Sequence, residues 1–205
     1  MVSDDKCALR RALRARRRQL SLDVVRAAGT AVRVQVRLLL VAHPAAALLA
    51  YLATENEIPT DGIIADCVQA RREMYLPSTT PVPRFVCWQP GDRLQPGPGG
   101  VLEPHGGLPL PGQRCAIALI PLVGWADDGT RLGRGAGFYD RVFATGSSGI
   151  LRLGLAYEFQ RCDYLPRDPW DVPMDYIITE QRIVRCGAGE VLRSESLQKG
   201  GLRLC

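Results

Sequence analysis

The segment best equipped for chemistry lies at positions 127–141 and reads D-D-G-T-R-L-G-R-G-A-G-F-Y-D-R. Its glycines at 129, 133, 135 and 137 let backbone N–H groups approach an anion closely, and Arg131 and Arg134 add multi-donor positive charges. The glycine spacing differs from that of the G-x-G-x-x-G dinucleotide fingerprint, and the chain contains no G-x-x-x-x-G-K-[ST] loop. The pattern predicts a phosphate-binding loop; a surface loop with solvated arginines is the alternative.

Acidic residues near this segment could hold a metal ion. Asp140 lies at the start of a predicted helix, where a carboxylate could bind Mg²⁺ together with nucleotide phosphates. An acid that balances Arg134 or Arg141 at the helix start explains the same position equally well. Asp171 and Asp175 form a second pair before a predicted strand, and their position alone does not choose between metal binding and loop solvation.

The hydrophobic pattern indicates which elements carry these residues. It predicts helices at 5–19, at 22–42, after Thr60 and at 138–144, and strands at 46–52, 74–77, 84–88, near 101, and at 115–123, 151–157, 175–179 and 182–184. Strands that alternate with helices favour an α/β fold. We expect a single-domain three-layer α-β-α sandwich with a mostly parallel, Rossmann-like sheet. The segment 90–112 is expected to hold little regular structure beyond the short strand near 101, and 124–137 is expected to be a loop.

The predicted topology places the glycine-rich loop at a binding edge. It follows 115–123, the most apolar predicted strand, and ligands of open α/β sheets bind at the carboxyl ends of strands. We expect one domain over 1–185, with a helical pair at 1–43 packed on it. Residues 186–205 lose the apolar periodicity, which predicts a loose tail.

Charge is distributed unevenly along the chain. The formal net charge is +5, but residues 6–40 hold ten bases and one acid, Asp23, and so carry +9. This end of the chain is expected to have an anionic partner: phosphate, nucleic acid or a membrane surface. Within it, residues 16–18 are three consecutive arginines, interpreted by default as a solvated helix surface.

Cysteine spacing and hydropathy indicate where the protein works. The seven cysteines are widely spread and contain no C-x-x-C pair, so neither a disulfide framework nor a zinc ribbon is indicated, and we expect reduced thiols. There is no uninterrupted apolar run of membrane-spanning length, and no apolar signal region follows the basic N-terminus. We therefore expect a cytoplasmic protein without a membrane partner.

Four motifs together carry a resemblance to a known family. They are R-L-G-R-G-A-G-F-Y-D at 131–140, D-V-P-M-D at 171–175, E-N-E-I at 55–58 and K-C-A-L-R at 6–10. In this order, over roughly 5–185, the chain resembles the 5-formyltetrahydrofolate cyclo-ligases, also called methenyltetrahydrofolate synthetases. The resemblance implies an enzyme that uses ATP and Mg²⁺ to convert 5-formyltetrahydrofolate into 5,10-methenyltetrahydrofolate, with release of ADP and phosphate. It implies that the formyl oxygen is phosphorylated, that N10 closes the ring and that phosphate leaves.

The resemblance also assigns roles to residues of this chain. The implied ATP-binding residues are Lys6, Arg10, Arg131, Leu132, Gly133, Arg134, Gly135, Ala136, Gly137, Phe138 and Tyr139. The implied substrate-binding residues are Leu52, Glu57, Arg134, Gly135, Ala136, Gly137 and Phe138. Arg134 and Tyr139 are the implied catalytic residues, and Asp140 and Asp175 the implied Mg²⁺ ligands.

The chain departs from the family pattern at three positions. Ala136 stands where many members carry Lys or Gly, so one phosphate-binding cation is absent and Arg131 or Arg134 would have to compensate. Phe138 replaces a common Tyr and keeps only its stacking face. Trp170 stands where His is common.

Two other functions remain open from the sequence. A nucleic-acid-binding protein would use the basic N-terminal helices, although the chain has no helix-turn-helix, RRM or KH signature. A folate-binding paralogue with weak turnover is the other alternative, suggested by Ala136 and Trp170. In the favoured interpretation the partners are small molecules and the protein is a monomer.

Overall fold

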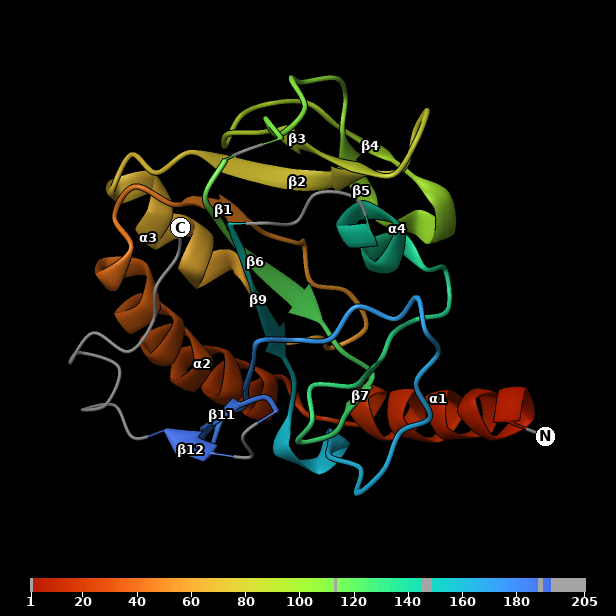
Figure 1. The fold of residues 1–205 in the computed structure, drawn as a ribbon. Coiled ribbons are helices and arrows are strands. Elements are labelled where there is room, and N and C mark those ends of the chain that lie inside the picture. The colour runs from red at the N-terminus through yellow and green to blue at the C-terminus, as the bar shows by residue number, and fades with distance from the viewer. Residues whose placement is uncertain (1, 113, 145–148, 188–189, 193–205) are drawn as a thin grey trace.

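The computed structural model describes residues 2–112, 114–144, 149–187 and 190–192, and its centre is one eight-stranded sheet (Figure 1). The strand order is β12-β11-β10-β9-β6-β1-β2-β3. Its strands are β1 (Ala47–Leu49), β2 (Met74–Ser78), β3 (Arg84–Cys87), β6 (Ala116–Pro121), β9 (Ile150–Leu155), β10 (Tyr176–Ile178), β11 (Ile183–Arg185) and β12 (Glu190–Leu192). The run from β10 to β2 is parallel, and β3, β11 and β12 pair antiparallel at the edges. The mostly parallel α/β sheet expected from the sequence is confirmed.

Helices cover both faces of this sheet. They are α1 (Val2–Arg18), α2 (Leu22–Ala42), α3 (Asp61–Gln69) and α4 (Phe138–Ala144). Alternate side chains of β6 point to opposite faces: Ile117 and Leu119 pack in the cluster that includes α2 and α3, whereas Ala118 and Ile120 pack in the cluster that contains Phe143 of α4. This alternation produces the three layers visible in Figure 1.

Polar contacts fix both ends of α2. Ser21 caps its start by accepting a hydrogen bond from the Val24 N–H at 3.4 Å. At its other end, the Arg72 guanidinium donates to the carbonyls of Leu40 (2.7 Å), His43 (2.9 Å) and Ala46. Arg72 thereby satisfies acceptors that a helix end leaves without partners and secures the turn into β1.

Helix α1 packs differently from α2. It lies at the carboxyl end of the sheet, beside the segment that follows β6 (Figure 1). Its few apolar contacts come from Leu9 and Leu13, which pack against a small cluster that contains Val123 and Leu132. Its basic side chains add ion pairs with Asp168 and Glu55 and hydrogen bonds to backbone carbonyls. The expected helical pair therefore has one member on a face of the sheet and the other at its binding edge.

Short strands lie in two segments that were expected to be largely irregular. The segment 124–137 contains a hairpin of β7 (Gly124–Trp125) and β8 (Arg131–Leu132), and 90–112 contains the pair β4 (Leu94–Pro96) and β5 (Leu102–Pro104). Strand β5 confirms the strand predicted near 101, whereas β4, β7 and β8 were not predicted. The expectation of a loose tail from residue 186 is wrong for β12, which pairs with β11. Strands of two or three residues are too short for an alternating pattern, and pairing with a neighbour determines them instead. The rest of the tail lies outside the described residues.

The cysteines and the lengths of the helices bear on two predictions made from composition. Cys7, Cys67, Cys87, Cys162 and Cys186 are free thiols, as expected. Cys115, directly before β6, is disulfide-bonded, so the expectation that every cysteine is reduced is wrong at that position. Among the described residues, no helix combines the length and apolar character needed to cross a membrane.

Candidate active site

The glycine-rich loop lies under α1. Arg10 Nε donates a hydrogen bond to the Gly133 carbonyl at 2.9 Å, and a Cβ on Gly135 would come 3.9 Å from the Arg10 guanidinium. Gly135 has φ +102°, a conformation that favours glycine. Lys6, one turn earlier on α1, pairs with Asp168 at 2.9 Å. Residues from the N-terminus, the glycine loop and the 168–171 segment therefore meet at one place.

The buried Arg131 forms an ion pair with the partly exposed Asp140 beside this loop. The Arg131 side chain is only 6% exposed, and its Nη2 donates to Asp140 Oδ1, which also accepts from the Val172 N–H at 3.1 Å. Burial lowers the pKa of Arg131, and the charge of Asp140 opposes that effect. The Arg131 Nε is buried and has no hydrogen-bond partner among the described residues. A buried donor without a partner is rare in folded proteins.

Asp175 has a different environment from Asp140. Its Oδ2 accepts from the Arg152 backbone N–H (2.7 Å) and Nε (2.9 Å), and its Oδ1 accepts from Arg152 Nη2 (2.7 Å). Within the described part of the chain, no group of three or more His, Cys, Asp or Glu side chains could hold a metal ion. Mg²⁺ needs only one or two carboxylates when phosphates supply further ligands, so Asp140 fits that chemistry. Asp175 would first have to give up contacts with Arg152, and its role as a ligand stays a prediction.

The loop after β1 gathers arginines around Glu55. Arg14 donates to both Glu55 carboxylate oxygens at 2.8 Å, Arg18 donates at 2.5 Å, and Arg134 Nη2 lies 3.1 Å from Oε2. These hydrogen bonds, with Arg14 the largest contributor, lower the pKa of Glu55 to about 2. Glu55 and the next residue, Asn56, both have positive φ, at 50° and 55°. The ion pairs with Arg14 and Arg18 hold this turn against α1.

Glu57 lies two residues further along this loop and is almost fully buried. Its Oε2 accepts from the Thr54 N–H at 3.0 Å and from the Thr54 hydroxyl at 3.3 Å. Its Oε1 lies 3.5 Å from Arg134 Nε and 3.6 Å from Arg17 Nη2, beyond hydrogen-bond distance of both. Arg134 also donates to the Thr54 hydroxyl at 2.7 Å. Arg134 of the glycine loop and Glu57 of the β1 loop, both assigned to the substrate from the sequence, are therefore neighbours.

Aromatic side chains form the floor beneath the glycine loop. Tyr139 packs edge-on against Phe138, with ring centroids 5.1 Å apart, and Phe138 packs edge-on against Phe85 at 5.9 Å. Burial, assisted by the charge of Glu57, raises the pKa of the Tyr139 hydroxyl, which is therefore protonated at neutral pH. Leu132, assigned to ATP from the sequence, packs its side chain into the cluster with Leu9, so its side chain faces away from the loop surface.

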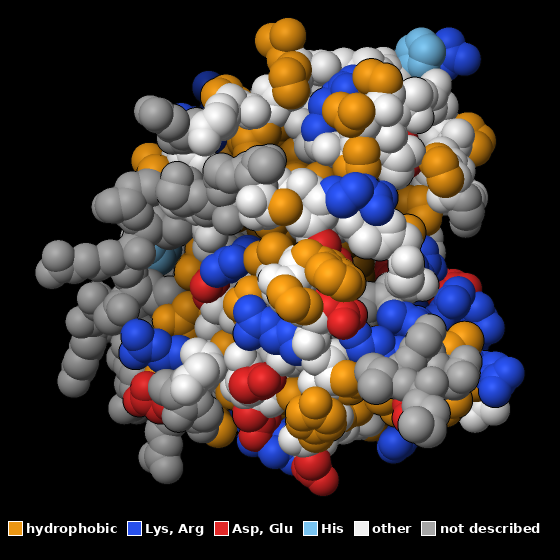
Figure 2. All heavy atoms as spheres, turned by 45° about the vertical axis from the view of Figure 1, so that its right-hand side comes forward, with side chains coloured by type: hydrophobic (Ala, Val, Ile, Leu, Met, Phe, Trp, Pro, Cys, Tyr) orange, Lys and Arg blue, Asp and Glu red, His pale blue; other side chains and the backbone are white. Residues whose placement is uncertain are grey.

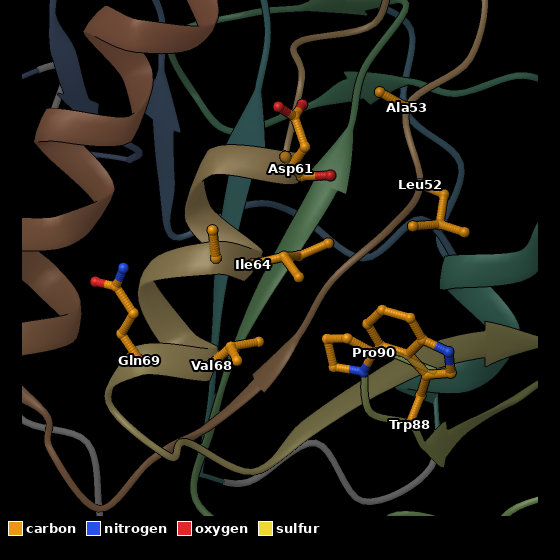
Figure 3. A pocket seen from close by; sticks show the side chains of 10 residues that line it. Leu52, Ala53, Asp61, Ile64, Val68, Gln69, Trp88 and Pro90 are labelled. Atoms are coloured by element: carbon orange, nitrogen blue, oxygen red, sulfur yellow. The ribbon is translucent and has the colours of Figure 1, made fainter. Parts of the chain in front are cut away.

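A cavity of about 680 Å³ opens beside the loop that follows β1. Leu52 lies at one end of the cavity, and Trp88 faces Ile64 and Val68 of α3 across it (Figure 3). The walls are mainly apolar, with Thr60, Asp61 and Gln69 as the polar members. Leu52 and Ala53 of this lining belong to the same loop as Glu57. Apolar walls beside a few polar groups are typical of sites for aromatic ligands.

Several site residues escaped the sequence analysis. Arg17 was interpreted as part of a solvated helix surface, but its side chain is 1% exposed and faces Glu57. Arg14 and Arg18 bind Glu55, and Arg152 binds Asp175. The four-residue spacing of bases along α1 was an available signal, because such spacing places side chains on one helix face. Figure 2 shows basic and acidic side chains interspersed on the face that carries α1 and α4.

The fold and the site define a class of protein. A mostly parallel sheet with a glycine loop, buried arginines and a buried carboxylate at its carboxyl edge is the arrangement of an α/β enzyme that binds an anionic ligand there. Residues 2–180 match the 5-formyltetrahydrofolate cyclo-ligase family. The chain belongs to that family and is a ligase.

Relatives agree with this assignment. The chain is 31% identical over 131 residues to the 5-formyltetrahydrofolate cyclo-ligase of Haemophilus influenzae, a match that covers 60% of this chain and 70% of the relative. The Escherichia coli K12 enzyme of the same name is 28% identical over 65% of this chain and 77% of its own. The NMR structure of Aquifex aeolicus 5,10-methenyltetrahydrofolate synthetase superposes with a TM-score of 0.77 at 27% identity, covering 92% and 96% of the two chains. The Mycoplasma pneumoniae synthetase superposes with a TM-score of 0.70 at 26% identity, covering 86% and 99%.

Proposed function

We propose that the protein cyclises 5-formyltetrahydrofolate to 5,10-methenyltetrahydrofolate at the expense of ATP, in the presence of Mg²⁺, and releases ADP and phosphate. The observation that carries the proposal is the position of Arg134. Its guanidinium lies 3.5 Å from Glu57 Oε1, on the side assigned to folate, while its backbone belongs to the loop assigned to the ATP phosphates. One residue thus connects the two substrate ends.

The phosphate end consists of cations and backbone donors. Lys6, Arg10 and Arg131 supply positive charge, and the exposed backbone of Gly135 and Ala136 is accessible to an anion. Asp140 is the residue proposed to hold Mg²⁺, which when bound would neutralise phosphate charge. Asp175 remains its predicted companion. Because residue 136 is alanine, Arg131 and Arg134 supply side-chain charge at this point of the loop.

The folate end consists of Glu57 and the cavity beside Leu52. Glu57 Oε1 accepts no hydrogen bond from the described residues, so its lone pairs are available to N–H donors of a pterin ring. The apolar walls around Leu52 and Trp88 suit the aromatic part of the substrate. Glu57 is linked to the glycine loop through Thr54, which accepts a hydrogen bond from Arg134, and Leu52 precedes Thr54 in the same loop.

The reaction requires positioning and charge stabilisation more than a protein nucleophile. The formyl oxygen attacks the γ-phosphorus, and the bond from that phosphorus to ADP breaks. N10 then attacks the activated carbon and loses its proton, and the carbon–oxygen bond breaks with phosphate as the leaving group. Arg134 is placed to stabilise the phosphoryl charge, and the protonated Tyr139 hydroxyl is a hydrogen-bond donor beside it.

The nucleic-acid alternative loses support from the orientation of α1. The bases that would have to track a phosphate backbone instead contact partners within the chain: Lys6, Arg10, Arg14, Arg17 and Arg18. A folate-binding paralogue with weak turnover keeps some support, because Ala136 supplies no cation to the loop. The expected monomeric state and cytoplasmic location stay predictions.

The test is the appearance of the near-ultraviolet absorbance of the methenyl product. The purified full chain is mixed with 5-formyltetrahydrofolate, with and without ATP and Mg²⁺, and Glu57→Gln is compared with the exposed control Glu190→Gln. We expect an ATP-dependent signal that Glu57→Gln weakens and Glu190→Gln leaves unchanged. Binding of 5-formyltetrahydrofolate without turnover would favour the paralogue, and retention of an oligonucleotide without folate binding would refute the proposal.

A further inference from the structure

Arg17 is a buried arginine at the centre of the site. Its Nε donates to the Glu55 carbonyl at 3.0 Å, and its Nη1 donates to the Leu122 carbonyl at 3.1 Å. These carbonyls belong to the loops that follow β1 and β6, two neighbouring strands of the sheet. Arg17 therefore anchors the end of α1 to both loops at the binding edge.

The third nitrogen of Arg17 is not used for anchorage. Its Nη2 is buried and has no hydrogen-bond partner among the described residues. It lies 3.6 Å from Glu57 Oε1 and 3.8 Å from Glu55 Oε2. Burying a charged donor without a hydrogen bond destabilises a fold, so a purely structural role does not account for this nitrogen.

The Glu57 carboxylate, beside Arg17, accepts hydrogen bonds from the described residues at only one of its two oxygens. Thr54 binds Glu57 Oε2, whereas Oε1 has two cationic nitrogens near it, of Arg17 and Arg134, both outside hydrogen-bond distance. Two positive charges attract Oε1 without using its lone pairs, and in a buried setting that attraction is strong. The carboxylate is thereby held in place with one oxygen ready for a ligand.

We propose that Arg17 is a positioning residue that holds the Glu57 carboxylate for folate. The inference rests on the proposed function, in which Glu57 accepts hydrogen bonds from the pterin ring. Arginine suits the task because its planar fork can donate to two carbonyls while a third nitrogen faces a carboxylate, a geometry that the single ammonium of lysine does not reproduce.

A double-mutant cycle on the full chain tests the proposal. Arg17→Met is made in the wild-type and Glu57→Gln backgrounds, with Arg11→Met as the control, because Arg11 lies on the same helix and is exposed. The readouts are the Kd of 5-formyltetrahydrofolate without ATP, by calorimetry, and the KM values of both substrates. We expect Arg17→Met to raise the folate Kd about tenfold in the wild type, with the ATP KM changed less than about twofold. In the Glu57→Gln background, where a neutral amide replaces the carboxylate, the rise should be less than about threefold.

Other outcomes would overturn the inference. An equal rise of the folate Kd in both backgrounds, or parallel rises of both KM values, would mean that Arg17 only supports the fold. If Arg17→Met does not fold, the same cycle with Arg17→Lys gives the deciding comparison. A wild-type protein that binds folate but shows no turnover would refute the proposed reaction while the Kd cycle still decides the role of Arg17. A wild-type protein that binds no folate would overturn both.

Discussion

The ion pairs of Glu55 predict a pH-dependent contribution to stability. Substitution by Gln keeps the shape and the hydrogen-bond acceptor but removes the charge that Arg14, Arg18 and Arg134 share. The pKa of Glu55 is about 2 in the folded protein, against an ordinary value of 4.5. At about 1.4 kcal/mol for each tenfold change in proton affinity, this difference sets an upper limit of about 3 kcal/mol. Because 25% of the side chain is exposed, screening by water reduces the expected loss in Glu55→Gln to about 1–2 kcal/mol.

The sign of the pH dependence follows from which state binds the proton first. In the unfolded chain Glu55 protonates near pH 4.5, whereas in the folded protein it stays ionised down to about pH 2. Its contribution is therefore complete well above pH 4.5 and is lost as the pH falls toward 2. About 60% of it should remain at pH 3.5 and about 40% at pH 3.

Urea unfolding of the wild type and Glu55→Gln at pH 7, 3.5 and 3 measures this contribution. The difference between their free energies of unfolding should shrink by more than half between pH 7 and pH 3. The control is Glu190→Gln, because Glu190 is 57% exposed and the Arg185 guanidinium with which it pairs lies 3.9 Å away. That variant should stay within about 0.5 kcal/mol of the wild type. A Glu55→Gln difference that is equal at all three pH values would refute the electrostatic explanation.

Three further substitutions test other parts of the structure. Arg10→Ala removes the contact with the Gly133 carbonyl and should raise the KM for ATP about tenfold, and that for folate much less; equal changes in steady-state kinetics would count against a nucleotide role. Asp140→Asn should abolish turnover at any Mg²⁺ concentration, and it should also lower the thermal midpoint, because the buried charge of Arg131 loses its counter-ion. Activity near that of the wild type in a magnesium titration would exclude Asp140 as a ligand. Arg72→Met should lower the free energy of unfolding by about 2–4 kcal/mol, because three carbonyls lose their donor; a loss below about 1 kcal/mol in urea would mean that water replaces Arg72.

Local sequence patterns predicted the glycine loop and the sheet well. The segment 131–140 combines residue types that have few structural uses together, and an apolar strand directly before it indicated the binding edge. The strand 115–123 was recognisable because a central parallel strand is buried on both faces and is therefore apolar throughout. For such elements, the order of residue types in the sequence is enough to predict their environment in the fold.

The local sequence pattern alone could not predict which arginine of α1 is buried in the site. The run at 16–18 is uniformly basic, so composition does not tell Arg17, which is buried, from Arg16, which lies 4.4 Å over the Phe159 ring. What distinguishes them is the rotation of the helix relative to Glu55 and Glu57, residues about forty positions away. The environment of the predicted Mg²⁺ ligand Asp175 was equally unpredictable, because nothing near it in the sequence indicates that Arg152 donates to its carboxylate oxygens.

Helix α1 connects both ends of the site through its register. Lys6, Arg10 and Arg14 repeat every four residues, close to the 3.6 residues of one helical turn, and Arg17 continues the same face. One codon gained or lost between Arg10 and Arg14 would rotate the first half of the helix by about 100° and displace it by about 1.5 Å relative to the second half. Lys6 would then leave Asp168, and Arg10 would leave the glycine loop, although every side chain of the site was still present. We therefore expect insertions and deletions in this segment to be tolerated less well than substitutions of its outward-facing residues. Deletion scanning would detect this constraint, and alanine scanning would miss it.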